Sequence, residues 1–259
     1  MSERFVECAQ SVPVPTRRTV VRSAAWAVPA VAVVSAAPAF AASNCTTYSV
    51  TNFGLTNGVL SNNGDTWTGT HVVAGQPSIW MQVSSTRTGS MQAYTEHFGT
   101  VSNAGGTGRP GLRLHQRRAT ANVGSAQAAH AGVYTVTFER PVTNLVVTLT
   151  DIDLARESQN YGRQWDDRVT ITSPAAWSVL THGDNILGTG ADVSNALRTE
   201  TNSNLPNTSG LGNVTLGFTG PVSQFTINYW NGFSNADSDS RSQLIFLNSI
   251  SFEHEVCAV

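Results

Sequence analysis

The 259-residue chain carries charged side chains at only 12% of its positions, and all fifteen of its basic residues are Arg. An ordinary soluble domain has about 25% charged residues. The formal charge of −2 and the lack of Lys exclude a nucleic-acid-binding protein with a basic face. The sparse charge also excludes a coiled coil and a charged disordered chain. A chain rich in Thr, Val, Asn and Gly favours β-strands joined by polar turns.

The N-terminal segment has the pattern of a secretory signal. Residues 16–22 read TRRTVVR, and a short apolar run over 24–37 leads to the small-residue sequence PAFA at 38–41. The run is shorter than the ~20 residues of a membrane-spanning helix. The pattern therefore predicts a signal peptide over 1–41, of the twin-arginine type, that is cleaved before a mature chain of residues 42–259.

The composition of this signal narrows the expected location of the protein. Its basic residues are all Arg, it is rich in Ala, and Trp26 and Pro29 lie in its apolar part. Over residues 16–43 it resembles the signals of exported actinobacterial proteins. No later stretch is apolar enough to span a membrane. We expect an extracellular protein, or one held at the cell surface without a transmembrane segment.

Two cysteines remain after this cleavage, Cys45 and Cys257, one near each end of the mature chain. In an oxidising compartment such a pair predicts one disulfide. The alternative is a free thiol that binds metal or acts in catalysis, but the pair lacks the close Cys-x-x-Cys spacing of such sites. A bond between the two ends also favours a single domain.

Alternation of apolar and polar residues predicts an all-β fold, a single antiparallel β-sandwich of the jelly-roll or immunoglobulin-like kind. A single helical turn is expected only at 192–198. The predicted strands are 46–53, 65–73, 78–84, 112–116, 133–138, 145–151, 167–172, 214–218, 225–229 and 243–252.

An internal repeat relates two segments of the chain. Residues 136–149 align with 216–229, and both contain Phe-x-x-Pro-Val, beginning at Phe138 and Phe218. We interpret each segment as a hairpin whose turn is set by proline; chance matching of two alternating segments is the alternative. If the hairpins are equivalent, their distal ends lie at the same end of the sandwich. The pattern resembles jelly-roll and immunoglobulin-like modules of bacterial surface proteins, without indicating one family.

Acidic residues gather where these hairpins end. Alternation places Asp151 and Asp153 on the face of Leu145, Val147 and Leu149, and the loop after the second hairpin is also acidic. Hard oxygen ligands of this kind suit Ca²⁺. The candidate calcium ligands are Asp151, Asp153, Asp167, Asp237 and Asp239.

Two other interpretations of the acidic residues stay open. Asp151 and Asp153 can act as paired carboxylates in glycoside hydrolysis, although the chain lacks a Glu-x-Asp-x-Glu strand motif. Alternatively, the carboxylates cap turns and pair with Arg156, Arg163 or Arg168. Nucleophilic and zinc chemistry have less support, because the chain has no Gly-x-Ser-x-Gly motif and its six His residues are scattered.

Aromatic residues near the acidic loops supply a binding hypothesis, because aromatic faces stack on sugars or anchor protein partners. The candidate ligand-binding residues are Tyr161, Trp165, Trp230 and Phe233. With no recognisable catalytic constellation, the sequence favours a non-enzymatic binding or adhesion module. Its expected partner is a surface glycan or a host or cell-envelope protein. The alternatives are a secreted glycan-active hydrolase that uses Asp151 and Asp153, and a purely structural envelope protein.

Overall fold

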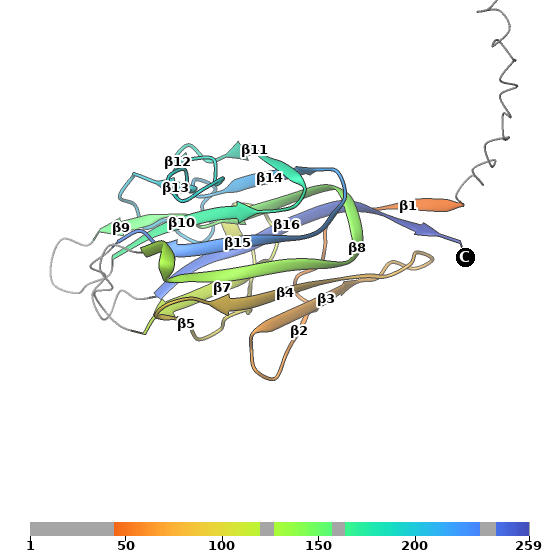
Figure 1. Ribbon diagram of the computed structural model, residues 1–259, viewed down its shortest axis with the longest axis horizontal. Helices are drawn as coiled ribbons and strands as arrows, with labels where there is room; N and C mark the ends of the chain where they lie inside the picture. Colours follow the sequence, from red (N-terminus) through yellow and green to blue (C-terminus); the bar gives the residue numbers. More distant parts are fainter. Residues whose placement is uncertain (1–43, 120–126, 157–163, 234–241, 259) are drawn as a thin grey trace, which may run out of the picture. The chain divides into compact units, whose positions relative to one another are not determined.

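A computed structural model describes residues 44–119, 127–156, 164–233 and 242–258 (Figure 1). The segment in which we predict a signal lies outside these residues. Within them the chain is almost entirely β, with short 3-10 turns at η1 (Ala104–Gly106) and η2 (Gln127–Ala129). The strands are β1 (Cys45–Val50), β2 (Val59–Leu60), β3 (Thr66–His71), β4 (Ile79–Arg87), β5 (Met91–Ala93), β6 (Thr100–Val101), β7 (Gly111–Arg118), β8 (Ala131–Thr150), β9 (Leu154–Arg156), β10 (Gln164–Thr172), β11 (Ala176–His182), β12 (Ile186–Leu187), β13 (Arg198–Thr199), β14 (Val214–Thr219), β15 (Val222–Asn231) and β16 (Ser242–Cys257).

The strands form an antiparallel β-sandwich, as the alternation predicted. One layer has the order β2-β3-β4-β8-β15-β10-β9. In the other, β14 pairs with β11 and β8, and β16 pairs with β8, β7 and β1. Strand β8 belongs to both layers, because its first half pairs with β4 and β15 and its second half with β14 and β16. The inward-facing side chains of both layers, among them Val136, Val147 and Ile227, form one apolar core.

The two Phe-x-x-Pro-Val segments are corners between the layers rather than hairpins. Within β8 the chain bends after Phe138 and turns back, so that its two halves lie in different layers (Figure 1). The corner between β14 and β15 does the same, since these strands each pair with β8 and not with one another. The predicted hairpin pairing was therefore wrong. The predicted meeting of the distal ends is confirmed, because Leu149 pairs with Val214 and Ala131 with Trp230.

Each predicted strand coincides with an observed one, although the boundaries differ. The strands that the sequence did not indicate are short or irregular, such as β2, β5 and β12. Residues 192–198 form no helix. Instead, the carboxylate of Asp192 accepts hydrogen bonds from Ser194 and Asn195 and holds a turn before β13. A side chain that satisfies the backbone locally favours a turn over a helix.

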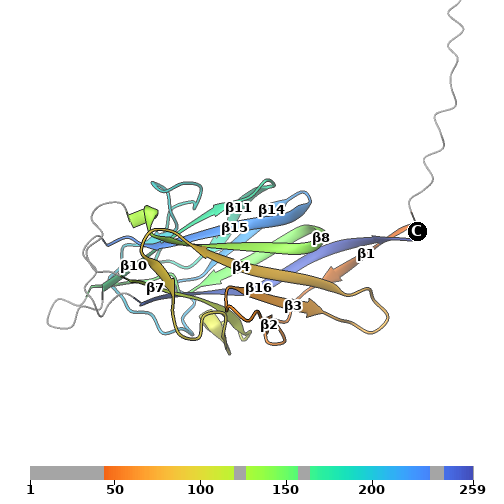
Figure 2. The ribbon, with the colours of Figure 1, turned by 60° about the horizontal axis from the view of Figure 1, so that its bottom comes forward.

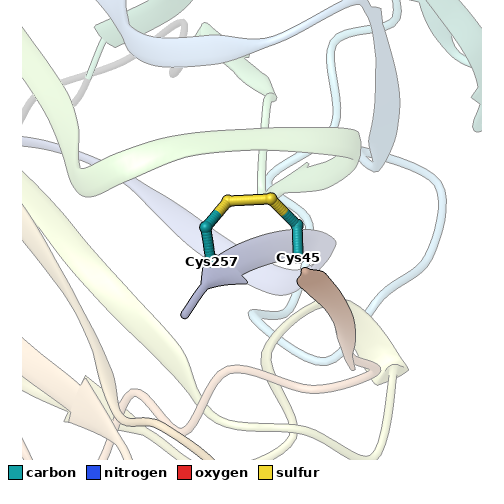
Figure 3. The surroundings of a disulfide bond; sticks show 2 residues. All are labelled: Cys45 and Cys257. Atoms are coloured by element: carbon teal, nitrogen blue, oxygen red, sulfur yellow. A yellow bond between two sulfur atoms is a disulfide. The ribbon is translucent and has the colours of Figure 1, made fainter. Parts of the chain in front are cut away.

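The disulfide predicted from the sequence joins Cys45 and Cys257 (Figure 3). The two residues lie opposite each other in the register of β1 and β16, and their Cα atoms are 3.8 Å apart. The bond closes a loop with a sequence separation of 212 residues. Figure 2 shows β1 beside the last part of β16, so the ends of the described chain meet at one end of the sandwich. The corners at Pro141 and Pro221 lie toward this end, and the acidic residues lie toward the other.

Candidate functional site

The acidic residues that follow β8 sit on irregular backbone rather than on a continued strand. Strand β8 ends at Thr150, and Asp151 adopts a left-handed conformation with φ of 70°. An L-residue with a side chain rarely adopts this conformation, and Asp is among those that tolerate it best. The prediction that Asp151 and Asp153 continue the alternating face of Leu149 was therefore wrong. Both carboxylates are nevertheless buried, with 7% and 5% of their surface exposed.

Asp167 is more deeply buried than Asp151 and Asp153, and it lies on the core face of β10 with Val169 and Ile171, as predicted. The hydroxyl of Tyr229 donates to Asp167 Oδ1 at 2.6 Å, and Gln243 Nε2 donates to the same oxygen at 3.1 Å. The backbone N–H of Asp153 donates to Oδ2. Burial raises the pKa of Asp167 well above its usual value, and the nearby Asp153 carboxyl adds to this.

Asp153 is held by two donors from different parts of the chain. The indole N–H of Trp165 donates to Oδ1, and the backbone N–H of Leu205 donates to Oδ2 at 2.8 Å. Burial raises the pKa of Asp153 to about 6, and these two hydrogen bonds oppose that rise. Both oxygen atoms are thus engaged in positioning the Trp165 ring and the 204–207 segment.

Asp151 differs from its neighbours because its Oδ1 is buried and has no hydrogen-bond partner. Burial raises the pKa of Asp151 to about 8, and the charge of Asp153 raises it further. A buried acceptor without a partner carries an unfavourable desolvation free energy. Gln243 Oε1 is in the same position, since Gln243 is 2% exposed and its Nε2 is committed to Asp167.

These groups line one pocket of about 350 Å³. Asp151 and Asp153 contribute from the segment after β8, Trp165 from β10, and Gln243 from β16. Tyr94 contributes from the segment just after β5, and His115 from β7. His115 Nδ1 lies 2.8 Å from the carbonyl of Thr95, and its Nε2 lies 2.8 Å from Ser242 Oγ. The remaining lining residues are Asn204, Leu205, Asn207, Ser242 and Leu244. The result is a concave site with carboxylates, amides and two aromatic rings, which suits a small polar ligand.

The arginine pairing that the sequence suggested involves a different carboxylate. Arg168 Nε and Nη2 contact Asp166 at 2.7 to 2.9 Å, on the face of β10 that points away from Asp167. The positions 166 and 168 share this face, as expected. The side chain of Arg156 and the whole of Arg163 lie outside what the structure describes. In the described part of the chain, no arginine contributes to the pKa shifts of Asp151, Asp153 or Asp167.

Three of the four aromatic residues selected from the sequence are among the described residues, and of these three only Trp165 lines the pocket. Trp230 is buried, with 4% of its surface exposed, and packs with Ala131 and Ala196. Phe233 is half-buried, and its carbonyl accepts a hydrogen bond from Arg118. Tyr161 lies outside the described residues, as do the candidate calcium ligands Asp237 and Asp239.

The sequence did not single out Tyr94, Gln243 or the 204–207 segment. Gln243 could have been recognised from the sequence, because it shares the inward face of β16 with Ile245 and Leu247. A polar side chain on a buried face needs a hydrogen-bond partner. His115 gave no separate signal among the six scattered histidines, since alternation alone does not show which of them faces a pocket. Tyr94 follows directly after the short strand β5, which the alternation did not predict.

The fit to a calcium ion is poor among the described residues. No group of three or more His, Cys, Asp or Glu side chains there is arranged to hold a metal ion. The carboxylate oxygen atoms of Asp153 and Asp167 accept hydrogen bonds from N–H and O–H donors, and these donors compete with a cation for the same lone pairs. The calcium ligand set therefore stays a prediction.

A second, more open groove of about 890 Å³ follows β11. Trp177, Leu180 and His182 line it, and it contains no Asp or Glu. Trp177 is half-buried, as Trp165 is, and packs against the main core. Trp177 is thus a matched control for Trp165 in the acidic pocket.

Comparisons with known proteins leave the family of this chain undetermined. No protein-family model matches the sequence, and no curated protein matches it. Among solved structures, the adhesin domain of PrgB from Enterococcus faecalis is similar over 80% of this chain and 69% of that chain, with 9% identity and a TM-score of 0.38. A similarity of this size does not identify a family or a function. In the described part of the chain, no helix is long and apolar enough to cross a membrane.

Proposed function

We propose that this protein is an exported surface or secreted binding module of the adhesion type, and that it holds a glycan in the pocket between Tyr94 and Trp165. The observation that carries the proposal is the pocket itself. It combines two aromatic rings with polar side chains, among them Asn204, Asn207 and Ser242, that line the same concave surface. Sugars are bound by this combination of ring faces and fixed polar groups.

Export is supported by two features that belong to different parts of the chain. The sequence over 1–41 has the pattern of a twin-arginine signal. The disulfide between Cys45 and Cys257 is of a kind that persists in oxidising compartments. Both features support a location outside the cytoplasm.

A glycan-array screen of the full chain, repeated with Trp165→Ala, tests the binding function. We expect a defined set of glycans to bind and Trp165→Ala to weaken that binding roughly tenfold or more, since a stacked ring contributes about 1 to 3 kcal/mol. Trp177→Ala is the matched control and should leave binding unchanged. If no glycan binds, or if both variants weaken binding equally, the proposal fails.

A glycoside hydrolase is the second candidate, because two adjacent carboxyls have pKa values raised to about 8 and about 6. At neutral pH Asp151 would hold a proton and Asp153 would be ionised, the division that an acid and a base require. Against it, both oxygen atoms of Asp153 accept internal hydrogen bonds. An enzyme should lose turnover in Asp151→Asn while the variant keeps its melting temperature.

Calcium is tested on the same samples by thermal unfolding with and without Ca²⁺. A stabilised protein should melt at a higher temperature with Ca²⁺ present, and Asp151→Asn should abolish that shift. The absence of any shift in the unmutated protein would end the calcium proposal.

A further inference from the structure

We propose that His97 makes the loop over residues 94–99 an acid-sensitive switch, in which protonation of the imidazole drives the ring out of the sandwich and frees the loop from β7. The loop lies between β5 and β6, and it carries Tyr94 on the wall of the acidic pocket. The opening of the loop is a property of the fold, and only its consequence for a ligand rests on the proposed binding function.

The loop is attached to β7 by backbone hydrogen bonds but has an unfavourable backbone conformation of its own. The N–H of Tyr94 donates to the carbonyl of His115, and the N–H of Phe98 donates to the carbonyl of Arg113. Glu96 is exposed and its carboxylate pairs with Arg113. Glu96 and Phe98 both have a φ of 59°, the left-handed conformation that side chains other than glycine rarely adopt. Such a conformation persists only where surrounding contacts hold it.

The contacts that hold the loop are made by two side chains that it inserts into the sandwich. His97 and Phe98 are only 7% and 4% exposed. Both rings lie against Tyr134 of β8, with ring centroids 5.7 and 6.3 Å from that of the phenol. Nε2 of His97 lies 3.1 Å from the hydroxyl oxygen of Ser85 on β4. The loop therefore stays closed while the imidazole occupies this buried site.

The buried site accepts the neutral imidazole and not the charged one. The hydroxyl of Ser85 donates to the carbonyl of Asp65 and accepts from Arg87 Nη2, so its other lone pair accepts the Nε2 proton of His97. Nδ1 of His97 is buried and has no hydrogen-bond partner. A second proton, on Nδ1, would make a buried charge with an unsatisfied donor, which carries a large desolvation free energy.

The groups that face His97 oppose its protonation on balance. Burial and the positive charge of Arg87 lower the pKa of His97 to about 4, against the opposing effects of the Asp65 carboxylate and the nearby carbonyl of His115. The imidazole of His115 lowers this pKa further. The phenol of Tyr134, which packs on the same ring, stays neutral because burial raises its pKa.

His115, on the neighbouring strand, lacks the feature that makes His97 a switch. Its Nδ1 lies 2.8 Å from the carbonyl of Thr95, and its Nε2 lies 2.8 Å from the hydroxyl oxygen of Ser242. A carbonyl only accepts, so Nδ1 donates, whereas a hydroxyl accepts from a protonated Nε2 as well as it donates to a neutral one. Protonated His115 therefore keeps both hydrogen bonds and can stay in place.

Acid therefore favours the open loop. In the open state His97 has the pKa of a free histidine, about 6.5, whereas in the closed state its pKa is about 4. The open state binds a proton that the closed state excludes, so the opening equilibrium increases up to roughly tenfold for each pH unit between these values. Tyr94 moves with the loop and leaves the His115 ring and the Arg117 guanidinium that it now contacts. Acid thus removes one wall of the pocket.

Hydrogen–deuterium exchange of the full chain from pH 7 to pH 4, corrected for the intrinsic exchange rate at each pH, tests the switch without a ligand. We expect the amides of Tyr94 and Phe98 to lose protection below about pH 6, by up to roughly tenfold for each pH unit. The amides of β15, in the core, should keep their protection. Equal protection of the loop at pH 7 and pH 4 would overturn the inference. A parallel loss throughout the sandwich would also overturn it, because the whole domain would then be unfolding in acid.

Two variants assign the effect to one residue. His97→Gln removes the titrating group and keeps a side chain that can donate to Ser85, so the protection of the loop should no longer depend on pH, whatever its level. His182→Gln, at an exposed histidine outside the loop, is the matched control and should retain the pH dependence of the unmutated protein. A dependence that survives in His97→Gln would assign the effect to another group and overturn the proposal.

An NMR titration of the unmutated protein keeps the test independent of any variant. The ring of His97 should titrate below the ordinary value for histidine, and the amide signals of Tyr94 and Phe98 should change over the same pH interval. A ring that titrates near pH 6.5 while those amide signals stay unchanged would contradict the switch.

The switch and the binding function fail in different ways. If a glycan binds, its affinity should fall more between pH 7 and pH 5 in the unmutated protein than in His97→Gln. Asp151 and Asp153 are present in both proteins, so this difference isolates His97. Glycan binding that depends on Trp165, with a loop whose protection is independent of pH, would overturn the switch and leave the binding module standing. A loop that opens in acid, in a protein that binds no glycan, would do the reverse.

Discussion

Trp165 donates its indole N–H to the buried carboxylate of Asp153, so the ring on the pocket wall is fixed by an acid behind it. Asp153 holds the backbone N–H of Leu205 with its other oxygen. One buried carboxylate thus positions two parts of the wall that lie far apart in the sequence. Asp151 differs from Asp153 in this respect, because its buried Oδ1 has no hydrogen-bond partner.

The indole hydrogen bond should be separable from the ring itself. Trp165→Phe keeps an aromatic face but leaves Asp153 Oδ1 without its donor, and we expect a loss of about 1 to 3 kcal/mol in the free energy of unfolding. Ligand affinity should fall less than in Trp165→Ala. Denaturant unfolding of both variants measures the first effect. Trp177→Phe, in the second groove, should show no loss from a broken carboxylate contact.

The buried acids should make the protein less stable as pH rises. The native pKa values of Asp151 and Asp153 are about 8 and about 6, above the value of about 3.9 in an unfolded chain. Between these values the unfolded state releases protons that the native state retains, so the free energy of unfolding decreases with increasing pH. We expect it to decrease from pH 7 to pH 8, above the range in which histidines with lowered pKa values, such as His97, produce the opposite trend.

Asp151→Asn supplies the control for this pH dependence. The amide does not titrate, so the variant should lose less stability than the unmutated protein over the same interval, by up to about 1.4 kcal/mol per pH unit. Urea unfolding at each pH provides the measurement. A variant with an unchanged slope would show that Asp151 does not titrate in this range.

The corner between β14 and β15 should depend on one glycine. Gly220 has a φ of 87°, and a Cβ at this position would contact nothing within 4 Å, so Gly220→Ala tests backbone conformation alone. We expect a loss of about 1 to 2 kcal/mol in unfolding free energy. Gly54→Ala is the matched control, because that glycine is equally open but lacks a positive φ. Thermal unfolding distinguishes the two.

Removal of the disulfide should affect stability and not recognition. By the loop-entropy relation, a bond that closes 212 residues contributes about 5 kcal/mol. The double variant Cys45→Ser with Cys257→Ser should therefore unfold at a lower denaturant concentration. The pocket lies at the other end of β16, so ligand affinity measured under native conditions should be retained. A parallel loss of affinity would contradict this separation.

The fold could be predicted because alternation persists wherever a strand contributes to the core. Ile79, Met81 and Val83 on β4, for example, are all buried, with polar residues between them. The layer change within β8 could not be predicted, because a corner and a hairpin use the same Phe-x-x-Pro-Val pattern. Only the partners of the two arms distinguish them, and partners are a tertiary property.

The site could be predicted only in part, for a similar reason. Asp151, Asp153 and Trp165 were found because they lie next to strands that the alternation predicts, the two acids after 145–151 and the ring just before 167–172. Tyr94 and Gln243 come to the pocket through β5 and β16, and no local pattern relates these strands to the end of β8. The left-handed conformation of Asp151 also breaks the alternation on which its orientation was inferred. Inference from one strand at a time thus locates the end of the sandwich where the acidic residues gather. It does not show which of their side-chain atoms lack a hydrogen-bond partner.

The bond between Cys45 and Cys257 also determines how the domain carries tension. When the two ends are pulled apart, the load passes from one sulfur atom to the other and does not reach the strands between them. Hydrogen bonds of the sandwich, the corners and the pocket are outside the path of the force. A domain built in this way keeps its acidic pocket folded under a mechanical load that would separate β1 from β16 if the two cysteines were reduced.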